Sequence, residues 1–371
     1  MKFQILQENL NKAINITSRF TSTKAQLPIL GNILISTKKS KIYISSTNLE
    51  ISASVQVGAK IDEEGELSIP AKVISEVISN LPKETINISS EKEQLKLSTA
   101  GFSSTILGME STDFPKVPNS LEKDNVISFS KDEISKSLGQ VTFATSLDET
   151  RPILTGVLFI FNKKSLFLVA TDGFRLSKKE ITLKNEGKIV QNAVVPKGVL
   201  SEISRGIFEE DEILFDLQEK EKQITFGIGD TVLTSRLLEG EYPDFEKIIP
   251  KESSLKVFLD KEEFLRAVKL ASVFARESAN VIKLKILKDS IKISGESGSA
   301  GSQETEVDAR VEKTDSSTSF EIAFNYHYIE DFLHSVSGEE VKMEFTNISA
   351  PGVFTDTSDP KYLHLIMPVK V

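Results

Sequence analysis

The sequence FQILQENLNKAI at residues 3–14 decides the fold, because its pattern returns twice along the chain. It recurs as ISFSKDEISKSL at residues 127–138 and as VFLDKEEFLRAV at residues 257–268. Each copy reads as a short strand that runs directly into a helix with apolar residues at positions i, i+3 and i+4. The first of these apolar residues, Leu10, Ile134 and Phe264, are 124 and 130 residues apart. Self-similarity at a nearly constant spacing predicts three tandem domains.

Three further blocks repeat in the same order. LPIL at 27–30 returns as RPIL at 151–154, and TDFP at 112–115 is matched by PDFE at 243–246. IPAKVI at 69–74 returns as VPKGVL at 195–200 and, more loosely, as FNYHYI at 324–329. Four blocks in one order are not expected by chance. Together with the Pro-containing segments near residues 118 and 250, they predict domains at 1–121, 122–251 and 252–371.

Composition excludes several classes of protein. Of 371 residues, 39% are hydrophobic and 27% charged, which is too apolar for a disordered chain, and the net charge is −9. Cysteine is absent, which excludes disulfides, thiolate nucleophiles and Cys-based metal sites. The first residues lack the apolar core of a signal peptide, and no apolar run approaches the length of a membrane span. We therefore expect a soluble, cytoplasmic protein.

Each copy predicts an α+β domain with segregated helices. Ile51, Ala53 and Val55 alternate as in a half-buried strand, and residues 86–88 and 95–97 continue that pattern. A second helix is expected to follow Pro70, since Pro is tolerated at the first turn of a helix. Two helices and many strands per copy fit this fold class.

Basic residues recur on the helices. Lys12, Lys136 and Arg266 each stand two residues after the first apolar position, roughly 200° around the helix and so on its outward face. The second helices open with Lys72 and Lys197, and more weakly with His327. Lysine is common on solvated helix faces, which is the alternative explanation. Recurrence in three copies of an acidic chain favours a basic surface that contacts phosphates without reading bases.

The signatures of enzymes are missing. The three histidines, at positions 327, 334 and 364, have no catalytic context, and no phosphate-binding Gly-rich loop occurs. Gly227–Asp230 is interpreted as a hairpin turn, and Ser297–Ser302 as a flexible loop. We expect no cofactor and no metal.

The chain resembles the bacterial DNA polymerase III β subunit, the sliding clamp family. The resemblance covers the full length and is carried by LPILGN at 27–32, ATDGFRL at 170–176, EGEYPDF at 239–245 and MPVKV at 367–371. It implies a non-catalytic processivity factor. Two chains would join head to tail into a ring of six similar domains, with helices lining the hole and sheets outside.

The resemblance also implies site residues. Lys12, Lys136 and Arg266 would face duplex DNA, and Lys24, Lys72 and Lys197 match basic positions of the family. Arg151 stands where relatives touch single-stranded template, but Pro152 and Ile153 replace aromatic residues that some members carry. Ile106 and Leu270 would lie near the contact between the two chains.

A pocket for partner peptides is implied as well. Its residues would be Leu154, Thr171, Gly173, Phe174, Arg175, Leu176, Pro243, Lys247, Ile248, Leu365, Met367, Pro368, Val369, Lys370 and Val371. Phe174 stands where many members carry histidine. The partners would be the DNA polymerase III alpha subunit, an ATP-driven clamp loader, other polymerases and repair proteins, each through a Gln-Leu-x-Leu-Phe-like segment.

Three function classes stay open at this stage. The first is a clamp that encircles DNA. The second is a repeat-built hydrolase with an unseen carboxylate site, which predicts turnover of a substrate. The third is a structural repeat module, which predicts no salt-dependent association with DNA. Likewise, residues 367–371 are either a wall of the peptide pocket or merely a closing edge strand.

Overall fold

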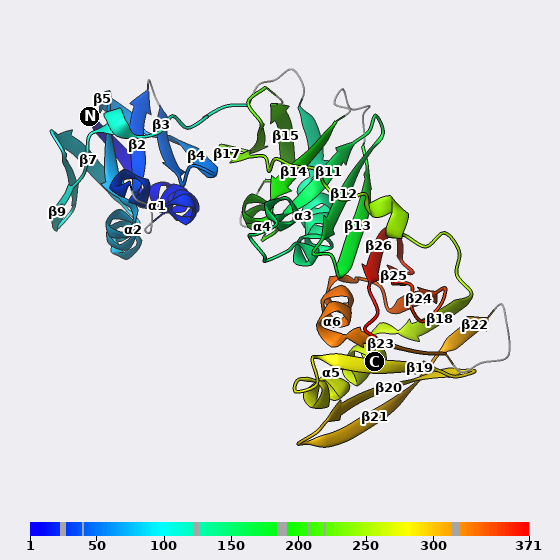
Figure 1. Ribbon diagram of the computed structural model, residues 1–371. Helices are drawn as coiled ribbons and strands as arrows, with labels where there is room; N and C mark the ends of the chain where they lie inside the picture. Colours follow the sequence, from blue (N-terminus) through cyan, green and yellow to red (C-terminus); the bar gives the residue numbers. More distant parts are fainter. Residues whose placement is uncertain are drawn as a thin grey trace. The chain divides into compact units, whose positions relative to one another are not determined.

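The computed structural model describes residues 1–22, 27–38, 41–121, 126–183, 191–205, 208, 210–218, 220–313 and 320–370. These residues form two compact units. Unit 1 comprises Met1–Asp132 and Gly206–Leu237, and unit 2 comprises Glu133–Arg205 and Leu238–Val371. Each unit contains two antiparallel sheets and the helices that cover them (Figure 1).

Unit 1 begins with the strand and helix that the repeated pattern predicts. Its elements are β1 (Lys2–Leu6), α1 (Gln7–Thr17), β2 (Asn32–Lys38), β3 (Lys41–Thr47), β4 (Ile51–Gly58), β5 (Lys60–Glu63), β6 (Gly65–Pro70), α2 (Ala71–Asn80), β7 (Thr85–Glu91), β8 (Gln94–Thr99), β9 (Phe102–Leu107), β10 (Ile127–Ser130), β15 (Glu212–Gln218), β16 (Gln223–Ile228) and β17 (Thr231–Arg236). Short 3₁₀ turns occupy Ser18–Phe20, Pro28–Gly31 and Ser111–Asp113. The sheet orders are β5-β1-β7-β8-β9 and β10-β15-β16-β17-β4-β3-β2-β6.

Unit 2 contains the remaining elements. They are α3 (Lys131–Gly139), whose first two residues belong to unit 1, β11 (Gly156–Phe161), β12 (Ser165–Thr171), β13 (Arg175–Thr182), β14 (Asn192–Pro196), α4 (Lys197–Ser204), β18 (Leu255–Asp260), α5 (Lys261–Ala275), β19 (Val281–Ile286), β20 (Ser290–Ser297), β21 (Gly301–Asp308), β22 (Arg310–Lys313), β23 (Phe320–Asn325), α6 (Tyr326–Ser335), β24 (Glu340–Phe345), β25 (Gly352–Asp356) and β26 (Asp359–Ile366). Its 3₁₀ turns are Thr142–Ala144, Pro152–Thr155 and Phe245–Ile248. The sheet orders are β14-β11-β12-β13-β26-β25-β24-β18-β22 and β21-β20-β19-β23.

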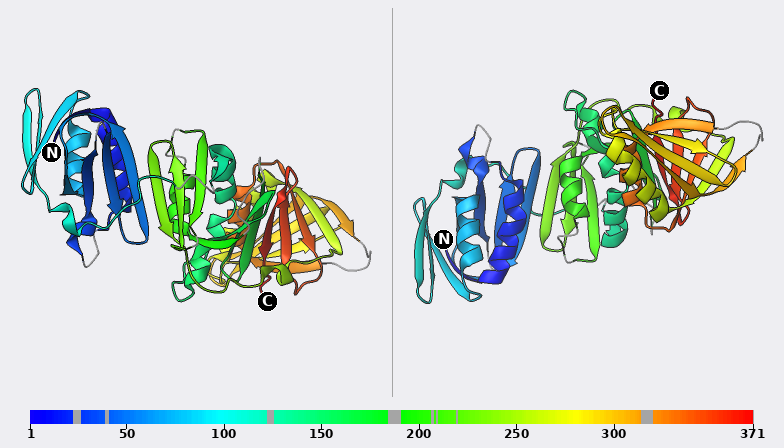
Figure 2. Two further views of the ribbon diagram at one scale, coloured as in Figure 1. Left: turned by 90° about the horizontal axis from the view of Figure 1, so that it is seen from above. Right: turned by 90° about the horizontal axis from the view of Figure 1, so that it is seen from below.

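The helices lie in pairs against the sheets, as the segregated α+β pattern predicts. In unit 1, α1 packs beside α2 and against β3 and β4 (Figure 2). In unit 2, α5 packs beside α6 and against β20 and β21. The second contact is close, because a Cβ added to Gly295 on β20 would lie 2.2 Å from the carbonyl oxygen of Ala271 on α5. Only glycine fits at that point of β20.

The predicted apolar stripes are buried. Leu10, Ile134 and Phe264 are 0% exposed, and the residues three and four positions after each of them are also buried. The repeated helix pattern is therefore the packing face of α1, α3 and α5. Burying this face is the main source of helix stability, since isolated helices of this length are marginal in water.

Two turn predictions had different outcomes. Gly227–Asp230 is a hairpin turn as predicted, because β16 and β17 pair from Ile228↔Thr231 onward and Gly229 has φ +56°. The interpretation of Ser297–Ser302 as a flexible loop is wrong. Ser297 pairs with Gly301, so β20 and β21 form a tight hairpin in which Gly301 has φ +95°. The Ser297 hydroxyl orders this turn by donating to Glu277 at 2.8 Å.

Candidate nucleic-acid and partner-binding surfaces

The recurrent basic side chains lie on the outward faces of their helices. Lys12 on α1, Lys136 on α3 and Arg266 on α5 are all exposed. Lys72 on the first turn of α2 is exposed too, whereas Lys197 at the start of α4 is half-buried. Lys24 lies outside the described residues. The outward face that helical spacing predicts for Lys12, Lys136 and Arg266 agrees with their exposure.

A groove on unit 1 gathers further positive charge beside Lys12. It has a volume of about 540 Å³ and runs along α1 and the end of α2. Lys12, Arg19 and Lys83 line it, and Glu8 pairs with Lys83 at 2.7 Å. Three cations and one carboxylate leave this groove positive in a chain whose total charge is negative. A positive groove attracts phosphates through Coulombic interaction.

The turn Thr171–Arg175 is fixed by its own hydrogen bonds. The Thr171 hydroxyl donates to the Arg175 carbonyl at 2.6 Å and accepts from the Gly173 amide at 3.0 Å. The Asp172 carboxylate accepts from the amides of Phe174 and Arg175 at 2.9 and 3.0 Å. Gly173 has φ +92°, which other residues rarely adopt. The turn therefore presents Phe174 to solvent, with 64% of that residue exposed.

The chain terminus is attached beside this turn. β26 lies inside the nine-stranded sheet, between β13 and β25, and ends at Ile366. The Met367 amide then donates to the Phe174 carbonyl at 2.8 Å, and the Val369 amide donates to the Ala323 carbonyl at 2.8 Å. Residues 367–370 are thus anchored without being a strand, whereas chain ends are ordinarily loose. Val371 lies outside the described residues.

The remaining predicted pocket residues divide into a buried layer and an exposed layer. Leu154, Leu176 and Leu365 are at most 5% exposed. Leu176 and Leu365 belong to one apolar cluster with Phe245 and Val353. The exposed layer contains Gly173, Phe174, Pro243, Lys247, Ile248, Met367, Val369 and Lys370, and Pro368 is half-buried. Exposed Phe174, Ile248 and Met367 stand two or three residues from cluster members in sequence, and exposed apolar side chains that gather are typical of a protein-binding surface. We call the exposed layer the partner surface.

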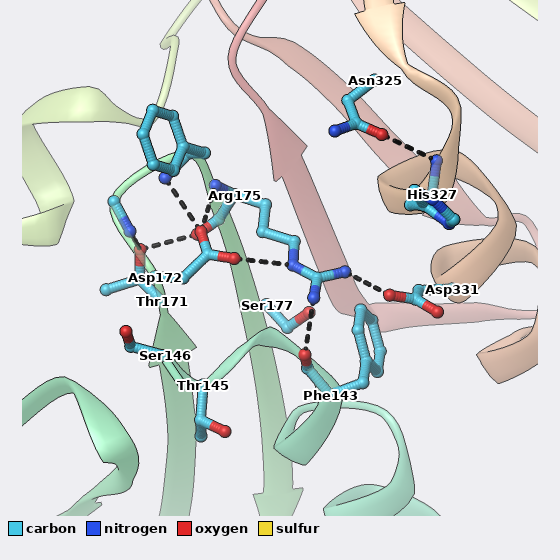
Figure 3. A network of polar contacts seen from close by, with 12 residues as sticks. Phe143, Thr145, Ser146, Thr171, Asp172, Arg175, Ser177, Asn325, His327 and Asp331 are labelled. Carbon is cyan, nitrogen blue, oxygen red and sulfur yellow. Dashed lines mark hydrogen bonds and ion pairs between the residues drawn. The ribbon is translucent and has the colours of Figure 1, made fainter. Parts of the chain in front are cut away.

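The predicted polar groups of this site have internal partners. Thr171 is only 6% exposed and bonds within its own turn. The Arg175 guanidinium binds Asp172 through Nε at 3.0 Å, the Phe143 carbonyl through Nη2 at 2.8 Å, and the Asp331 carboxylate through Nη1 (Figure 3). The guanidinium carbon also lies 4.6 Å from the centre of the Tyr328 ring. The side chain of Arg175, one of the residues predicted for the pocket, therefore holds the turn Thr171–Arg175 to Phe143 and to helix α6.

Sequence reasoning missed the members of this network. Phe143 follows α3, and Tyr328 and Asp331 lie on α6, so they are far from the turn in sequence. The repeat FNYHYI marked the second helix of the third copy but gave no sign that Tyr328 meets Arg175. A contact between side chains of different copies leaves no periodic signal in a single sequence.

The charges of Arg175 and Asp331 also act on Lys197. Burial and the nearby Arg175 lower the pKa of Lys197, while Asp331 opposes that shift. Lys197 is half-buried, and it is close enough to Arg175 and Asp331 for their charges to act on it.

The two residues predicted near a contact between chains differ in exposure. Leu270 on α5 is 47% exposed, and Val273, nearly one turn later, is 56% exposed. Ile106 is only 4% exposed but lies on β9, the edge strand of its sheet. Ile106 can therefore contribute to such a contact mainly through the strand that carries it.

Comparison with known proteins identifies the family. The DNA polymerase III beta subunit models match as the N-terminal domain at residues 1–118, the central domain at 128–244 and the C-terminal domain at 246–370. The chain belongs to the DNA polymerase III β subunit family. The beta sliding clamp of Staphylococcus aureus is 30% identical over 380 residues, covering 100% of this chain and 99% of the relative. That of Staphylococcus epidermidis is 29% identical with the same coverage.

Solved structures of sliding clamps share the fold of this chain. The DNA polymerase sliding clamp of Bacillus subtilis superposes with a TM-score of 0.94 at 27% identity, covering 100% of this chain and 99% of that one. The β subunit of Thermotoga maritima gives 0.91 at 26% identity with the same coverage. The fold is therefore three tandem clamp domains of mixed helix and sheet. The protein is a DNA sliding clamp, a non-catalytic processivity factor of DNA replication.

Family membership also implies encirclement of DNA, dimerisation and interaction with a polymerase. Of the three function classes, family membership therefore selects the DNA clamp and excludes the hydrolase and the structural repeat module. Within the described residues, the longest helices are too short or too polar to cross a membrane.

Proposed function

We propose that two copies of this chain close head to tail into a ring through the edge strands β9 and β21. The observation that carries the proposal is a strand pairing that occurs twice within the chain. In unit 1, β4 pairs antiparallel with β17, joining the sheet of the first repeat to that of the second. In unit 2, β13 pairs with β26, joining the second repeat to the third.

The repeats identify the two strands that lack this pairing. β21 occupies the position in the third repeat that β4 and β13 occupy in the first and second. β9 occupies the position in the first repeat that β17 and β26 occupy in the second and third. Among the described residues, β9 and β21 are sheet edges. An edge strand presents unpaired backbone groups, and a second copy would satisfy them with the same geometry.

Side chains support the same contact. α5 packs against β21, as α1 packs against β4, and it exposes Leu270 and Val273. A β9 strand added to β21 would bring its core-facing side, which carries Ile106, next to these residues. Burying exposed apolar groups on both partners favours association.

Inside such a ring, the exposed helix cations would meet the DNA. Lys12, Lys136 and Arg266 recur once per repeat, and Lys72 and Lys197 open the second helices of the first two repeats. We assign Lys24 to the same role from the family resemblance. Lysine and arginine contact phosphates without reading sequence, so the ring would slide. Retention would then depend on topology, and the tethered polymerase would stay at high effective concentration near the primer end.

We propose that the partner surface binds a short Gln-Leu-x-Leu-Phe-like segment. Phe174, Ile248 and Met367 are exposed apolar side chains, and such groups suit contact with large hydrophobic anchors of a peptide. A flexible segment loses conformational entropy on docking, so we expect a Kd of about 1 μM to tens of μM. Partners would be the DNA polymerase III alpha subunit, the clamp loader, other polymerases and repair proteins, which would compete for one surface.

The domain limits that we propose are 1–121, 122–251 and 252–371, which the three family matches at 1–118, 128–244 and 246–370 support. A role in chromosome replication supports a cytoplasmic location.

The test is a deletion of Val369–Val371. Because Met367 would keep its bond to Phe174, the turn should stay in place while one wall of the surface is lost. We expect loss of binding to a fluorescent Gln-Leu-Ser-Leu-Phe peptide and loss of polymerase stimulation, with the dimer and the melting temperature almost unchanged. Unchanged peptide affinity would reject this assignment of the surface.

A further inference from the structure

We propose that Asp331, on helix α6 of the third repeat, is a positioning residue for the partner surface. It would act through Arg175, without touching the bound peptide. This inference rests on the proposed peptide-binding function. The juxtaposition that suggests it appears in Figure 3, where the Asp331 carboxylate faces the guanidinium of Arg175 from a separate helix.

The first step concerns how the Arg175 guanidinium is held. One side is bound locally, by the Asp172 carboxylate, which lies three residues earlier on the same turn. The other contacts come from distant elements: the Phe143 carbonyl, the Tyr328 ring and Asp331. Among the described residues, Asp331 supplies the one charged contact to Arg175 from outside the turn. A charge-assisted bond to arginine is stronger and more directional than a neutral one.

The second step concerns what Arg175 holds in turn. Its backbone carbonyl accepts from Thr171, and its amide donates to Asp172, so Arg175 closes the turn that carries Phe174. The Phe174 carbonyl then accepts the Met367 amide. A chain of bonds therefore runs from α6 through Arg175 and Phe174 to the terminal segment. Both the turn and the terminal segment belong to the partner surface.

The third step is a charge argument. Burial lowers the pKa of Lys197, the nearby Arg175 cation lowers it further, and Asp331 opposes these effects. Neutralising Asp331 would remove the carboxylate that opposes the Arg175–Lys197 repulsion. The guanidinium would then lose its charged contact with α6 and keep only the weaker one to the Tyr328 ring. Asp331 is suited to a test, because 43% of its side chain is exposed and an asparagine of the same shape should create no cavity.

The experiment compares Asp331→Asn with Glu330→Gln in the full-length protein. Glu330 is the preceding residue on α6, and its substitution removes the same charge. Two quantities are measured: the Kd of a fluorescent Gln-Leu-Ser-Leu-Phe peptide, and hydrogen exchange of the Met367 and Val369 amides. Met367 reports the bond to the turn, whereas Val369 reports the bond to Ala323 and is an internal control.

We expect Asp331→Asn to weaken peptide binding about 3- to 10-fold and to speed exchange at Met367 much more than at Val369. Glu330→Gln should change neither quantity, and Asp331→Glu should restore part of the affinity because it restores the charge. The inference is overturned if Asp331→Asn and Glu330→Gln give the same Kd and the same exchange at Met367. If the unaltered protein does not bind the peptide, the proposed function fails; accelerated exchange at Met367 in Asp331→Asn would still support the positioning role, and unchanged exchange would reject it.

Discussion

Replacing Leu270 with alanine should weaken the dimer without unfolding the chain. Leu270 is 47% exposed in the single chain, so about half of its side chain is left to be buried by a partner. Full burial of a leucine side chain contributes about 1.5–3 kcal/mol, which leaves about 0.7–1.5 kcal/mol for each contact. A closed ring of two copies contains that contact twice. The dimer should therefore lose about 1.5–3 kcal/mol, a rise in its Kd of about 10- to 150-fold.

The assay is sedimentation velocity over a dilution series, with Leu147→Ala as the matched control. Leu147 is 88% exposed and lies in the segment between the Thr142–Ala144 and Pro152–Thr155 turns, so its loss should leave the dimer unchanged. Leu270→Asp should shift the protein further towards monomer, because a carboxylate would have to be desolvated at the contact. Equal Kd values for Leu270→Ala, Leu147→Ala and the unaltered protein would refute the contact between α5 and the β9 edge.

The remaining predictions concern charge and pH. Replacing Lys12, Lys136 and Arg266 together with glutamate should impair loading onto DNA in a retention assay. Because all three side chains are exposed, the circular dichroism spectrum and the melting temperature should stay close to those of the unaltered protein. A variant that fails to fold would contradict the exposed placement of these side chains. His364 is 0% exposed, and burial, followed by the charge of Arg175, lowers its pKa to about 3. The unfolded chain binds a proton at His364 below about pH 6.5 and the folded chain does not, so stability is lost as pH falls from 6.5 towards 3. Between pH 7 and pH 5 the free energy of unfolding should fall by about 2 kcal/mol because of His364. A His364→Gln variant, measured by urea unfolding, should lack this part of the pH dependence. If the free energy of unfolding changes with pH equally in both proteins, the role of His364 is rejected.

The helical part of the fold could be predicted from the sequence because its signal is local. The stripe at Leu10, Ala13 and Ile14 recurs in each repeat, and burial of that stripe fixes which face carries Lys12. Orientation followed from the helical period alone. Recurrence added what one helix could not show, namely that the outward cation is a property of the repeat.

The partner surface could be predicted only in part. Motifs near residues 171–176 and 367–371 pointed to the turn and the terminal segment, and the structure joins these two through the bond between Met367 and Phe174. The role of Arg175 was not predictable, because its partners Phe143, Tyr328 and Asp331 come from elements more than thirty residues away in sequence or from another repeat. Such contacts depend on tertiary packing, which leaves no periodic pattern in the sequence.

At Ser297–Ser302, by contrast, a local sequence signal was present and gave a wrong prediction. Its glycine and serine content is typical of a flexible loop, yet the flanking residues pair in register and the Ser297 hydroxyl bonds to Glu277. Strand pairing between β20 and β21 overrides the local composition.

Retention on circular DNA tests the central claim, that the protein holds DNA by encircling it. The clamp would be loaded by its loader onto a nicked circular duplex, washed in about 0.5 M salt to screen the contacts of the helix cations, and then exposed to a restriction enzyme that cuts the circle once. We predict that the clamp remains on the intact circle through the wash and is released within minutes of linearisation, and that blocking both ends of the linear DNA with bound protein restores retention. Equal retention on circular and unblocked linear DNA, or release from the intact circle in salt, would contradict encirclement and leave chemical binding as the explanation.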